Sequence, residues 1–478
     1  MSRTSGSLTP APIPAPTPSR RPLTGLLASF TVSLFGTRLS MIALPWLVLD
    51  TSDSPIRTGL IVFCEAVPLV VGKALSGPLI DRMGGRSFSV AADLISAAVV
   101  ILVPLCYWLD VLPFGVLMVL AALIGLARGP GDVAKRTLIP TVAEDAGISL
   151  ERASGMMGTV ERIAGAAGPA AAGALVALLS PLWAMVGNSF CFVLSAGLIS
   201  IGALRTARQP AAAKTQSQNP TGMEAQNPAS EESRSEGSQT EGSQTEDGRP
   251  AESPSAESPP EESYVERLKA GARFLARNRL LRSIAIMLSV TNLIDAAYGS
   301  LLIPVWAKET GGGPAAIGAL GSAFGIAAVA GSLLATAYSH KLRRRRTYVI
   351  AFLIGGPPRF VVMALDVPLW VVVVTAVADG LAIGFINPII NAVQMERIPR
   401  HLLGRVSALT DSVGTAGIPL GPILAGVAVS FTGLAPVLLA CGAVYLACTV
   451  IPPLFPHWRE LDSRPQQPEE PEPRKERV

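Results

Sequence analysis

Charged residues are scarce in this chain of 478 residues, where Asp, Glu, Lys and Arg make up only 15% of the total. Soluble proteins carry about 25% of such residues. Hydrophobic residues reach 49%, so the composition points away from a soluble protein and toward a membrane. The net charge of +4 is small, and no basic face interleaved with aromatic residues predicts nucleic-acid binding.

Residues typical of metal sites and catalysis are also few. The five cysteines lie in apolar runs without a C-x-x-C pair, and the three histidines are distant in sequence from one another and from the cysteines. We therefore expect reduced, packed thiols and no metal site. The chain also lacks an ATP-binding loop of the G-x-x-x-x-G-K-S/T type and a nucleophile elbow, so we expect neither a cofactor nor an enzyme activity.

Long apolar runs are abundant. A bilayer core about 30 Å thick requires roughly 20 mostly apolar residues per helix. The runs are too long for barrel strands and show no alternation, so each is predicted to be a helix. The twelve predicted spans are residues 23–49, 57–80, 87–109, 111–127, 154–179, 181–204, 280–306, 314–338, 347–366, 368–391, 406–431 and 434–456.

Polar segments flank and divide these spans. Residues 1–22 are rich in Pro, Ser and Thr, and residues 205–263 contain the repeat EGSQTEGSQTE. Neither segment can bury enough apolar surface to fold, so both are predicted to be disordered. Residues 264–279 carry apolar residues at helical spacing among Arg and Lys, which predicts an amphipathic helix on the membrane surface.

The chain therefore divides into a six-helix half at 23–204 and another at 280–456, with a tail at 457–478. The halves share sequence, since GPAAAG at 168–173 is similar to GPILAG at 421–426. Lys and Arg concentrate in the loops after spans two, four, eight and ten, which predicts cytoplasmic termini and a cytoplasmic linker. The richness in Ala, Gly, Pro and Arg is compatible with a bacterium of high GC content, and we expect a protein of the bacterial inner membrane.

The turn GPLIDRMGGR at 77–86 joins spans two and three. Asp81 can meet a helix N-terminus of the other half, and nearby arginines can bond to carboxylates. The turn resembles the signature loop of the major facilitator superfamily, G-x-x-x-D-R/K-x-G-R/K-R/K, although Ser87 replaces its last basic residue. The matching residues are Gly77, Asp81, Arg82, Gly84 and Arg86.

This resemblance implies a cytoplasmic latch that holds the two halves together and stabilises the outward-facing state. Asp93 in span three is predicted to join the latch through Arg82 or Arg86. The equivalent turn of the second half, at 335–346, lacks the aspartate, so the latch would be asymmetric. The alternative is a turn that only sets the membrane topology.

A second motif occurs in spans five and eleven. The stretches AGAAGPAAAG (164–173) and GIPLGPILAG (417–426) resemble the antiporter signature of the same superfamily, g-x-x-x-G-P-x-x-G-G. The resemblance implies kinked helices that seal the protein against leak, whereas ordinary packing of small residues is the alternative. The matching residues are Gly168, Pro169 and Gly173 in span five and Gly421, Pro422 and Gly426 in span eleven.

Longer stretches, among them ALPWLVLDTSDSPIRTGL (43–60) and IPTVAEDAGISLERASGM (139–156), resemble twelve-span drug:proton antiporters similar to macrolide exporters and the enterobactin exporter. The resemblance covers most of the chain outside the termini and the linker. It implies an all-α membrane protein with twelve transmembrane helices in two six-helix pseudo-repeats, the major facilitator fold. Parallel repeats of this kind place the substrate site between the halves, near the bilayer midplane.

Ionisable residues inside spans are costly and need a reason. Asp295, midway along span seven, is predicted to carry a proton or to pair with a cationic substrate, unless neighbouring groups merely satisfy it. Arg38 and Glu65 are expected to pair, either as a fixed pair or as one that protonation of Glu65 opens. Asp379 and Asn387, two turns apart in span ten, are expected to share a face and line the cavity.

The sequence thus predicts a proton-coupled exporter of small amphipathic compounds that acts by alternating access. Its partners would be a small-molecule substrate, protons and the lipid bilayer, and we expect a monomer. A transporter of the same fold for a dedicated metabolite or siderophore is one alternative. A non-transporting membrane receptor or assembly protein that docks through the linker is another.

Overall fold

The computed structural model describes residues 19–202, 264–338, 343–365, 367–399 and 402–462. It contains twelve helical segments long and apolar enough to cross a membrane, which confirms the predicted architecture. The segments predicted to be disordered lie almost wholly outside the described residues. The exception is the end of the 1–22 segment, because the first helix already begins at Arg21.

The N-terminal half contains spans one to six. Ser54 and Ser149 begin two of its helices, because their side-chain oxygens accept the backbone N–H groups of Arg57 and Arg152 at 3.3 Å. The fourth span consists of two consecutive helices. The helices of this half are α1 (Arg21–Ser52), α2 (Pro55–Met83), α3 (Gly85–Trp108), α4 (Phe114–Thr137), α5 (Ile139–Ala146), α6 (Leu150–Leu179) and α7 (Pro181–Gly202).

The C-terminal half contains spans seven to twelve, and three of these spans are interrupted. Span seven contains a π-helical turn, η1, and spans nine and eleven each consist of two helices. The elements are α8 (Tyr264–Arg277), α9 (Arg279–Ala297), η1 (Tyr298–Leu302), α10 (Ile303–Glu309), α11 (Gly313–Tyr338), α12 (Arg344–Gly355), α13 (Pro357–Ala364), α14 (Leu369–Arg397), α15 (Leu403–Thr415), α16 (Leu420–Thr432), α17 (Leu434–Val450), η3 (Pro452–Leu454) and η4 (Pro456–Asp462).

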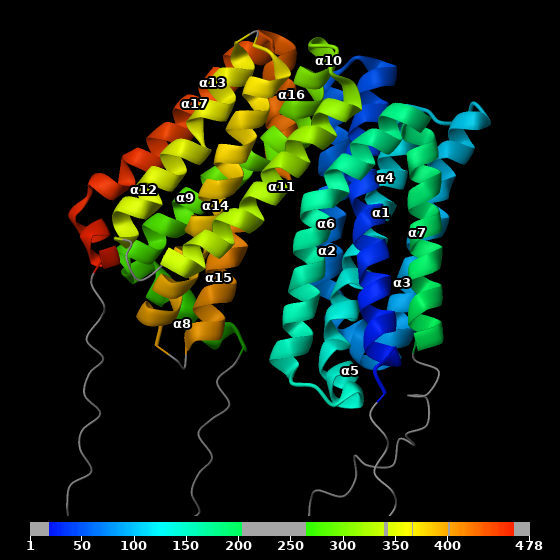
Figure 1. The fold of residues 1–478 in the computed structure, drawn as a ribbon, viewed down its shortest axis with the longest axis horizontal. Coiled ribbons are helices and arrows are strands. Elements are labelled where there is room, and N and C mark those ends of the chain that lie inside the picture. The colour runs from blue at the N-terminus through cyan, green and yellow to red at the C-terminus, as the bar shows by residue number, and fades with distance from the viewer. Residues whose placement is uncertain (1–18, 203–263, 339–342, 366, 400–401, 463–478) are drawn as a thin grey trace, which may run out of the picture.

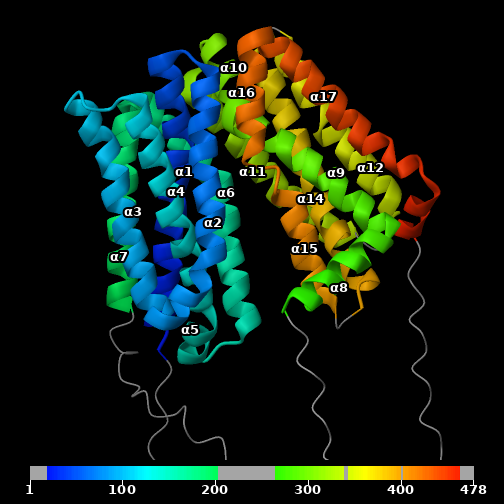
Figure 2. The same cartoon turned by 180° about the vertical axis from the view of Figure 1, so that it is seen from behind.

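The two halves lean together at one end of the molecule and separate at the other (Figures 1 and 2). We call the end that carries α10 the closed end and the end that carries α5 and α8 the splayed end. The halves meet where α6 packs against α11 and α2 packs against α16. The predicted amphipathic segment forms helix α8, which packs against α9 and α15 at the splayed end.

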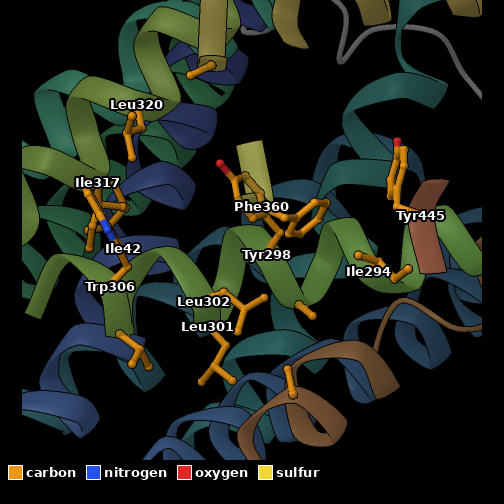
Figure 3. Packing of buried hydrophobic residues seen from close by; sticks show 14 of the residues in the cluster. Ile42, Ile294, Tyr298, Leu301, Leu302, Trp306, Ile317, Leu320, Phe360 and Tyr445 are labelled. Atoms are coloured by element: carbon orange, nitrogen blue, oxygen red, sulfur yellow. The ribbon is translucent and has the colours of Figure 1, made fainter. Parts of the chain in front are cut away.

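Apolar side chains fill the interior and also cover the outside. The buried core joins the halves, since Ile42 of α1 belongs to the same cluster as Ile317 and Leu320 of α11 (Figure 3). Large apolar side chains also face outward, such as Leu178 and Phe431, which are 81% and 82% exposed. Such a surface is stable only against lipid. The chain is therefore a multi-pass membrane protein.

Candidate functional site

A cavity of about 490 Å³ lies between the two halves, and side chains from both halves line it. Its apolar part includes Met41 and Ile42 from α1 and Phe324 from α11. Charged side chains also line it, although charge is costly between apolar spans. They are Arg38, Glu65, Arg128, Asp295, Arg359 and Asp379.

Arg359 of α13 is the centre of the charged cluster in the C-terminal half. Its Nη1 donates to Oδ2 of Asp379 at 2.5 Å, and its Nη2 donates to Oδ1 of Asp295. Arg359 is only 5% exposed, whereas the Asp295 side chain is 35% exposed. One buried cation thus binds two carboxylates, of which Asp295 is the more accessible from the cavity.

Aromatic rings enclose this guanidinium. The Arg359 Cζ lies 4.5 Å from the ring centroid of Tyr298, 4.8 Å from that of Phe360 and 5.3 Å from that of Tyr445. The three rings come from η1, α13 and α17 (Figure 3). A planar guanidinium suits this environment, because it stacks on ring faces while its edges donate hydrogen bonds.

Breaks in the helices place these side chains. α13 begins at Pro357, directly after Gly355 and Gly356 end α12, and Arg359 lies in its first turn. A Cβ on Gly355 would lie 2.9 Å from the Asp379 Oδ1 atom, so this glycine leaves room for the carboxylate. Asp295 lies one turn before η1, and single π-helical turns of this kind frequently occur at functional sites.

Arg359 was not among the residues predicted for the site. The available signal was that Arg359 is the one basic residue within the predicted ninth span, 347–366. Asp295 and Asp379 in other spans each needed a cation. The sequence does not reveal, however, that both carboxylates share the same guanidinium.

Glu65 of the N-terminal half pairs with Arg128, whose Nη1 lies 2.8 Å from the Glu65 Oε1. The expected pair between Glu65 and Arg38 is therefore not formed in this structure. The two helices approach closely, because a Cβ on Gly125 would collide with the backbone carbonyl of Glu65. The prediction ended span four at residue 127 and placed Arg128 in a loop, whereas α4 continues to Thr137.

Arg38 lines the cavity and forms no ion pair within the described part of the chain. Its Nη1 lies 3.7 Å from the Met41 sulfur, a weak acceptor, and its Nε is buried without a hydrogen-bond partner. A Cβ on Gly168 would lie 2.7 Å from the Arg38 Cγ. Gly168 of α6 thus provides the space that the arginine stem occupies.

Asn387 was expected to line the cavity with Asp379. Asp379 is buried and lines it, but Asn387 is exposed and is not among the lining residues. Eight residues of an α-helix amount to two turns plus about 80°. This rotation directs Asn387 away from the face of α14 that carries Asp379.

A family model described as the Major Facilitator Superfamily matches residues 26–294 and 284–478. The chain belongs to this superfamily. Among the described residues, no group of three or more His, Cys, Asp or Glu side chains is placed to hold a metal ion.

Curated relatives in the superfamily match the chain over nearly its whole length. The multidrug efflux pump Tap of Mycolicibacterium fortuitum is 27% identical over 449 residues, which cover 93% of this chain and 98% of the relative. Tap of Mycobacterium tuberculosis strain H37Rv is 29% identical over 467 residues, covering 94% and 96%. The solved structure of the nucleoside transporter NupG matches with a TM-score of 0.61 at 14% identity, covering 91% and 98%, and shows the shared fold.

The superfamily loop lies at the splayed end, where the halves are apart. Asp81 and Arg82 are exposed, and neither takes part in an ion pair within the described residues. A Cβ on Gly77 would meet nothing within 4 Å, and Gly84 adopts a φ of 79° that favours glycine in the turn. Arg86 donates to the Ser200 carbonyl of its own half at 2.9 Å. The predicted latch is not engaged in this state.

Asp93 does not contact Arg82 or Arg86, so its expected place in the latch is wrong for this structure. Lys135 of α4 donates to its Oδ1 at 2.8 Å, and Ser195 of α7 donates to its Oδ2 at 2.6 Å. Lys135 is fully buried. An unpaired carboxylate this deeply buried would be costly. Lys135 can supply the cation because α4 extends beyond the predicted end of span four at residue 127.

The antiporter-type motifs lie where the halves meet. On α6, a Cβ on Gly173 would lie 2.7 Å from the Cα of Gly318 in α11, and the Ala170 N–H donates to the Ser322 hydroxyl at 2.7 Å. On α16, a Cβ on Gly426 would lie 2.6 Å from the Pro55 carbonyl of α2. Small residues thus allow the backbones of the halves to approach closely.

The remaining motif residues have related positions. A Cβ on Gly318 would lie 2.7 Å from the carbonyl of Pro169, and a Cβ on Gly59 would collide with the carbonyl of Pro422. Gly421 faces the opposite way, against the Leu293 carbonyl of α9 in its own half. Both prolines therefore direct a carbonyl at a glycine of the other half.

Proposed function

We propose that this protein exports small amphipathic compounds from a bacterial cell in exchange for protons, by alternating access to its central cavity. The observation that carries the proposal is the cavity between the halves, where the partly exposed Asp295 shares Arg359 with Asp379. The relatives named multidrug efflux pumps support the direction and the broad substrate class. The mostly apolar lining suits amphipathic compounds.

We place the splayed end in the cytoplasm of a cell whose inner membrane holds the protein. The loops at this end follow spans two, four, eight and ten and carry most of the loop Lys and Arg. Both termini would then be cytoplasmic, and the structure would represent an inward-open state of a monomeric carrier. Closure at the splayed end and opening at the closed end would complete the exchange.

The shared arginine supports a simple exchange mechanism. With both carboxylates ionised, Asp295, Asp379 and Arg359 carry one surplus negative charge. A proton on Asp295 or a cationic group of the substrate can neutralise that charge, but not both together. A substrate that arrives from the cytoplasm would release the proton there, and a proton from outside would later release the substrate. Neutralisation would favour closure, because an uncompensated charge in the membrane interior is costly.

Inside-out vesicles with an imposed proton gradient and a pH-sensitive dye test this proposal. Lipophilic antibiotics and dyes are added singly to wild type, Asp295→Asn and Asp110→Asn. Asp110 is an exposed loop residue with a left-handed φ of 55°, which asparagine also tolerates. We expect compounds to discharge the gradient in wild type and Asp110→Asn but not in Asp295→Asn.

Equal discharge in all three proteins would remove Asp295 from the proton pathway and leave proton exchange standing. No discharge by any compound of a broad panel would contradict drug export. A carrier for a dedicated metabolite or siderophore, or a non-transporting receptor, would then be the better interpretation.

A further inference from the structure

We propose that Arg38 forms a binding subsite for an anionic group of the transported compound, so that the preferred substrates are amphipathic zwitterions. This inference rests on the proposed export function and names its substrate class. The anionic group would be a carboxylate, the planar acceptor that a guanidinium binds with two parallel hydrogen bonds.

The pairing of the cavity arginines distinguishes Arg38 from the other two. Arg128 donates to Glu65 at 2.8 Å, and Arg359 binds both Asp295 and Asp379. Arg38 pairs with no carboxylate in the described part of the chain, and its Nη1 instead lies 3.7 Å from the Met41 sulfur. An arginine keeps its charge in proteins, and a charge left unpaired in the membrane interior is costly. A ligand anion would remove this cost.

The protein also keeps Arg38 available to the cavity. The Arg38 stem packs against α6 at Gly168, where the absence of a side chain leaves room for it. The Arg38 Nη2 would lie 4.0 Å from a Cβ on Gly165 of the same helix. On the same helix, Glu161 accepts a hydrogen bond from Arg136 and so already has a cationic partner.

The charges of the two walls are complementary to a zwitterion. In the N-terminal half, two arginines, Arg38 and Arg128, and one carboxylate, Glu65, line the cavity, which leaves one surplus positive charge. In the C-terminal half, two carboxylates share Arg359, which leaves one surplus negative charge. Apolar side chains, Met41 and Phe324 among them, line the same cavity. A compound with an anionic end, an apolar body and a cationic end would match both walls.

A pair of dyes tests the subsite. Tetramethylrhodamine carries a free carboxylate beside its cationic ring system, and its methyl ester differs only in that the carboxylate is blocked. Binding of each dye to the purified full-length protein is measured by fluorescence anisotropy, with protein-free micelles subtracted. We expect wild type to bind the acid at least about tenfold more tightly than the ester, since even a single charge-assisted hydrogen bond has an effect of this size.

Four variants locate the effect. Arg38→Gln should reduce the preference for the acid to within about twofold, while its affinity for the ester stays within about threefold of wild type. Arg38→Lys should retain part of the preference, because it keeps the charge without the planar fork. Gly168→Val should also lose the preference, since its side chain would displace the Arg38 stem. Gly197→Val, at a glycine with nothing within 4 Å of a Cβ, should behave as wild type.

The possible failures are distinguishable. Equal binding of acid and ester by wild type would overturn the anion subsite and leave drug binding intact. An equal loss of both dyes in Arg38→Gln would show that Arg38 only shapes the cavity, which also overturns it. If wild type bound neither dye while other compounds discharged the proton gradient, the subsite would be refuted and export would stand. If no compound acted either, both proposals would fail.

Discussion

Lys308 of α10 donates through Nζ to the backbone carbonyl of Leu49 in α1 at 2.6 Å and so connects the two halves at the closed end. The same Nζ lies 2.9 Å from an Asp53 carboxylate oxygen. Asp53 is 85% exposed at its side chain, so the ion pair contributes little. The bond to the carbonyl is charge-assisted, and bonds of this kind contribute about 1.5–3 kcal/mol. Lys308 is therefore a principal polar contact across the closed end.

Lys308→Met should open the closed end more often. Loss of a bond of about 1.5–3 kcal/mol to Leu49 should raise the open population at least about tenfold, since about 1.4 kcal/mol changes an equilibrium tenfold. Spin labels at Asp50 and Thr310, both exposed near this contact, report the distance in a background without the five native cysteines. Lys308→Arg keeps a cationic donor and should resemble wild type. Identical distance distributions in all three proteins would mean that apolar packing alone closes this end.

Arg359→Met should lower the free energy of unfolding by about 3–5 kcal/mol. The substitution leaves the buried Asp379 and the partly exposed Asp295 without their shared cation, and breaking one side of a buried ion pair has this typical cost. Thermal unfolding in detergent measures the change. Arg152→Met is the matched control, because Arg152 is exposed at the start of α6 and should change stability by less than about 0.5 kcal/mol. An equal effect of both substitutions would argue against the cluster as a stabilising unit.

Glu65 should be energetically coupled to Arg128 and not to Arg38. A double-mutant cycle with Glu65→Gln and Arg128→Gln should give a coupling energy of about 1–3 kcal/mol, as residues in direct contact do. The cycle with Arg38→Gln should be additive to within about 0.5 kcal/mol. Unfolding free energies in detergent provide both cycles. A larger coupling to Arg38 would restore the pair expected from the sequence.

Gly173→Val should weaken contact between the halves. A Cβ at this position would approach the backbone of α11 at Pro314 and Gly318, so the helices must separate. We expect the spin labels described above to report a more open closed end and transport to fall at least about tenfold. Gly197→Val has free space around it and serves as the control. A normal transport rate in Gly173→Val would show that the close approach is dispensable.

Asp81→Asn should reduce transport without changing the stability of the splayed state. Asp81 is exposed and has no ion-pair partner among the described residues, so removing its charge costs this state little. Asp81 is predicted to meet a helix N-terminus of the other half, and it would reach that helix only when the splayed end closes. We expect an unchanged unfolding temperature together with a transport rate several-fold below wild type. A wild-type transport rate in Asp81→Asn would favour the alternative, that the turn at 77–86 only sets the membrane topology.

The spans were predictable because the lipid core imposes a long apolar run on every crossing helix. Span two was expected at 57–80 and α2 extends over Pro55–Met83. The end of span four was misjudged, because charges usually mark the end of a span. Here Arg128 and Lys135 are paired inside the half, with Glu65 and Asp93, so they do not end the helix.

Four of the five residues predicted for coupling or binding line the cavity, because an ionisable residue in a span rarely lies there by chance. Their partners were not predictable, since α2 and α4 meet at Gly125 and span nine breaks at Gly355. Such contacts depend on how helices far apart in sequence pack. The sequence therefore indicates which residues need a partner but not which partner each one has.

The charged pairs of the cavity each remain within one half, since Glu65 binds Arg128 in the first and Arg359 binds Asp295 and Asp379 in the second. Rocking of one half against the other would therefore separate none of these buried charges. The halves can change orientation as preassembled units, so no ion pair of the cavity has to break during the conformational change. An empty carrier would then be restrained by its glycine-lined contacts, by Lys308 and by the uncompensated charge of its cavity, which leaves cargo and proton to decide when the cavity changes sides.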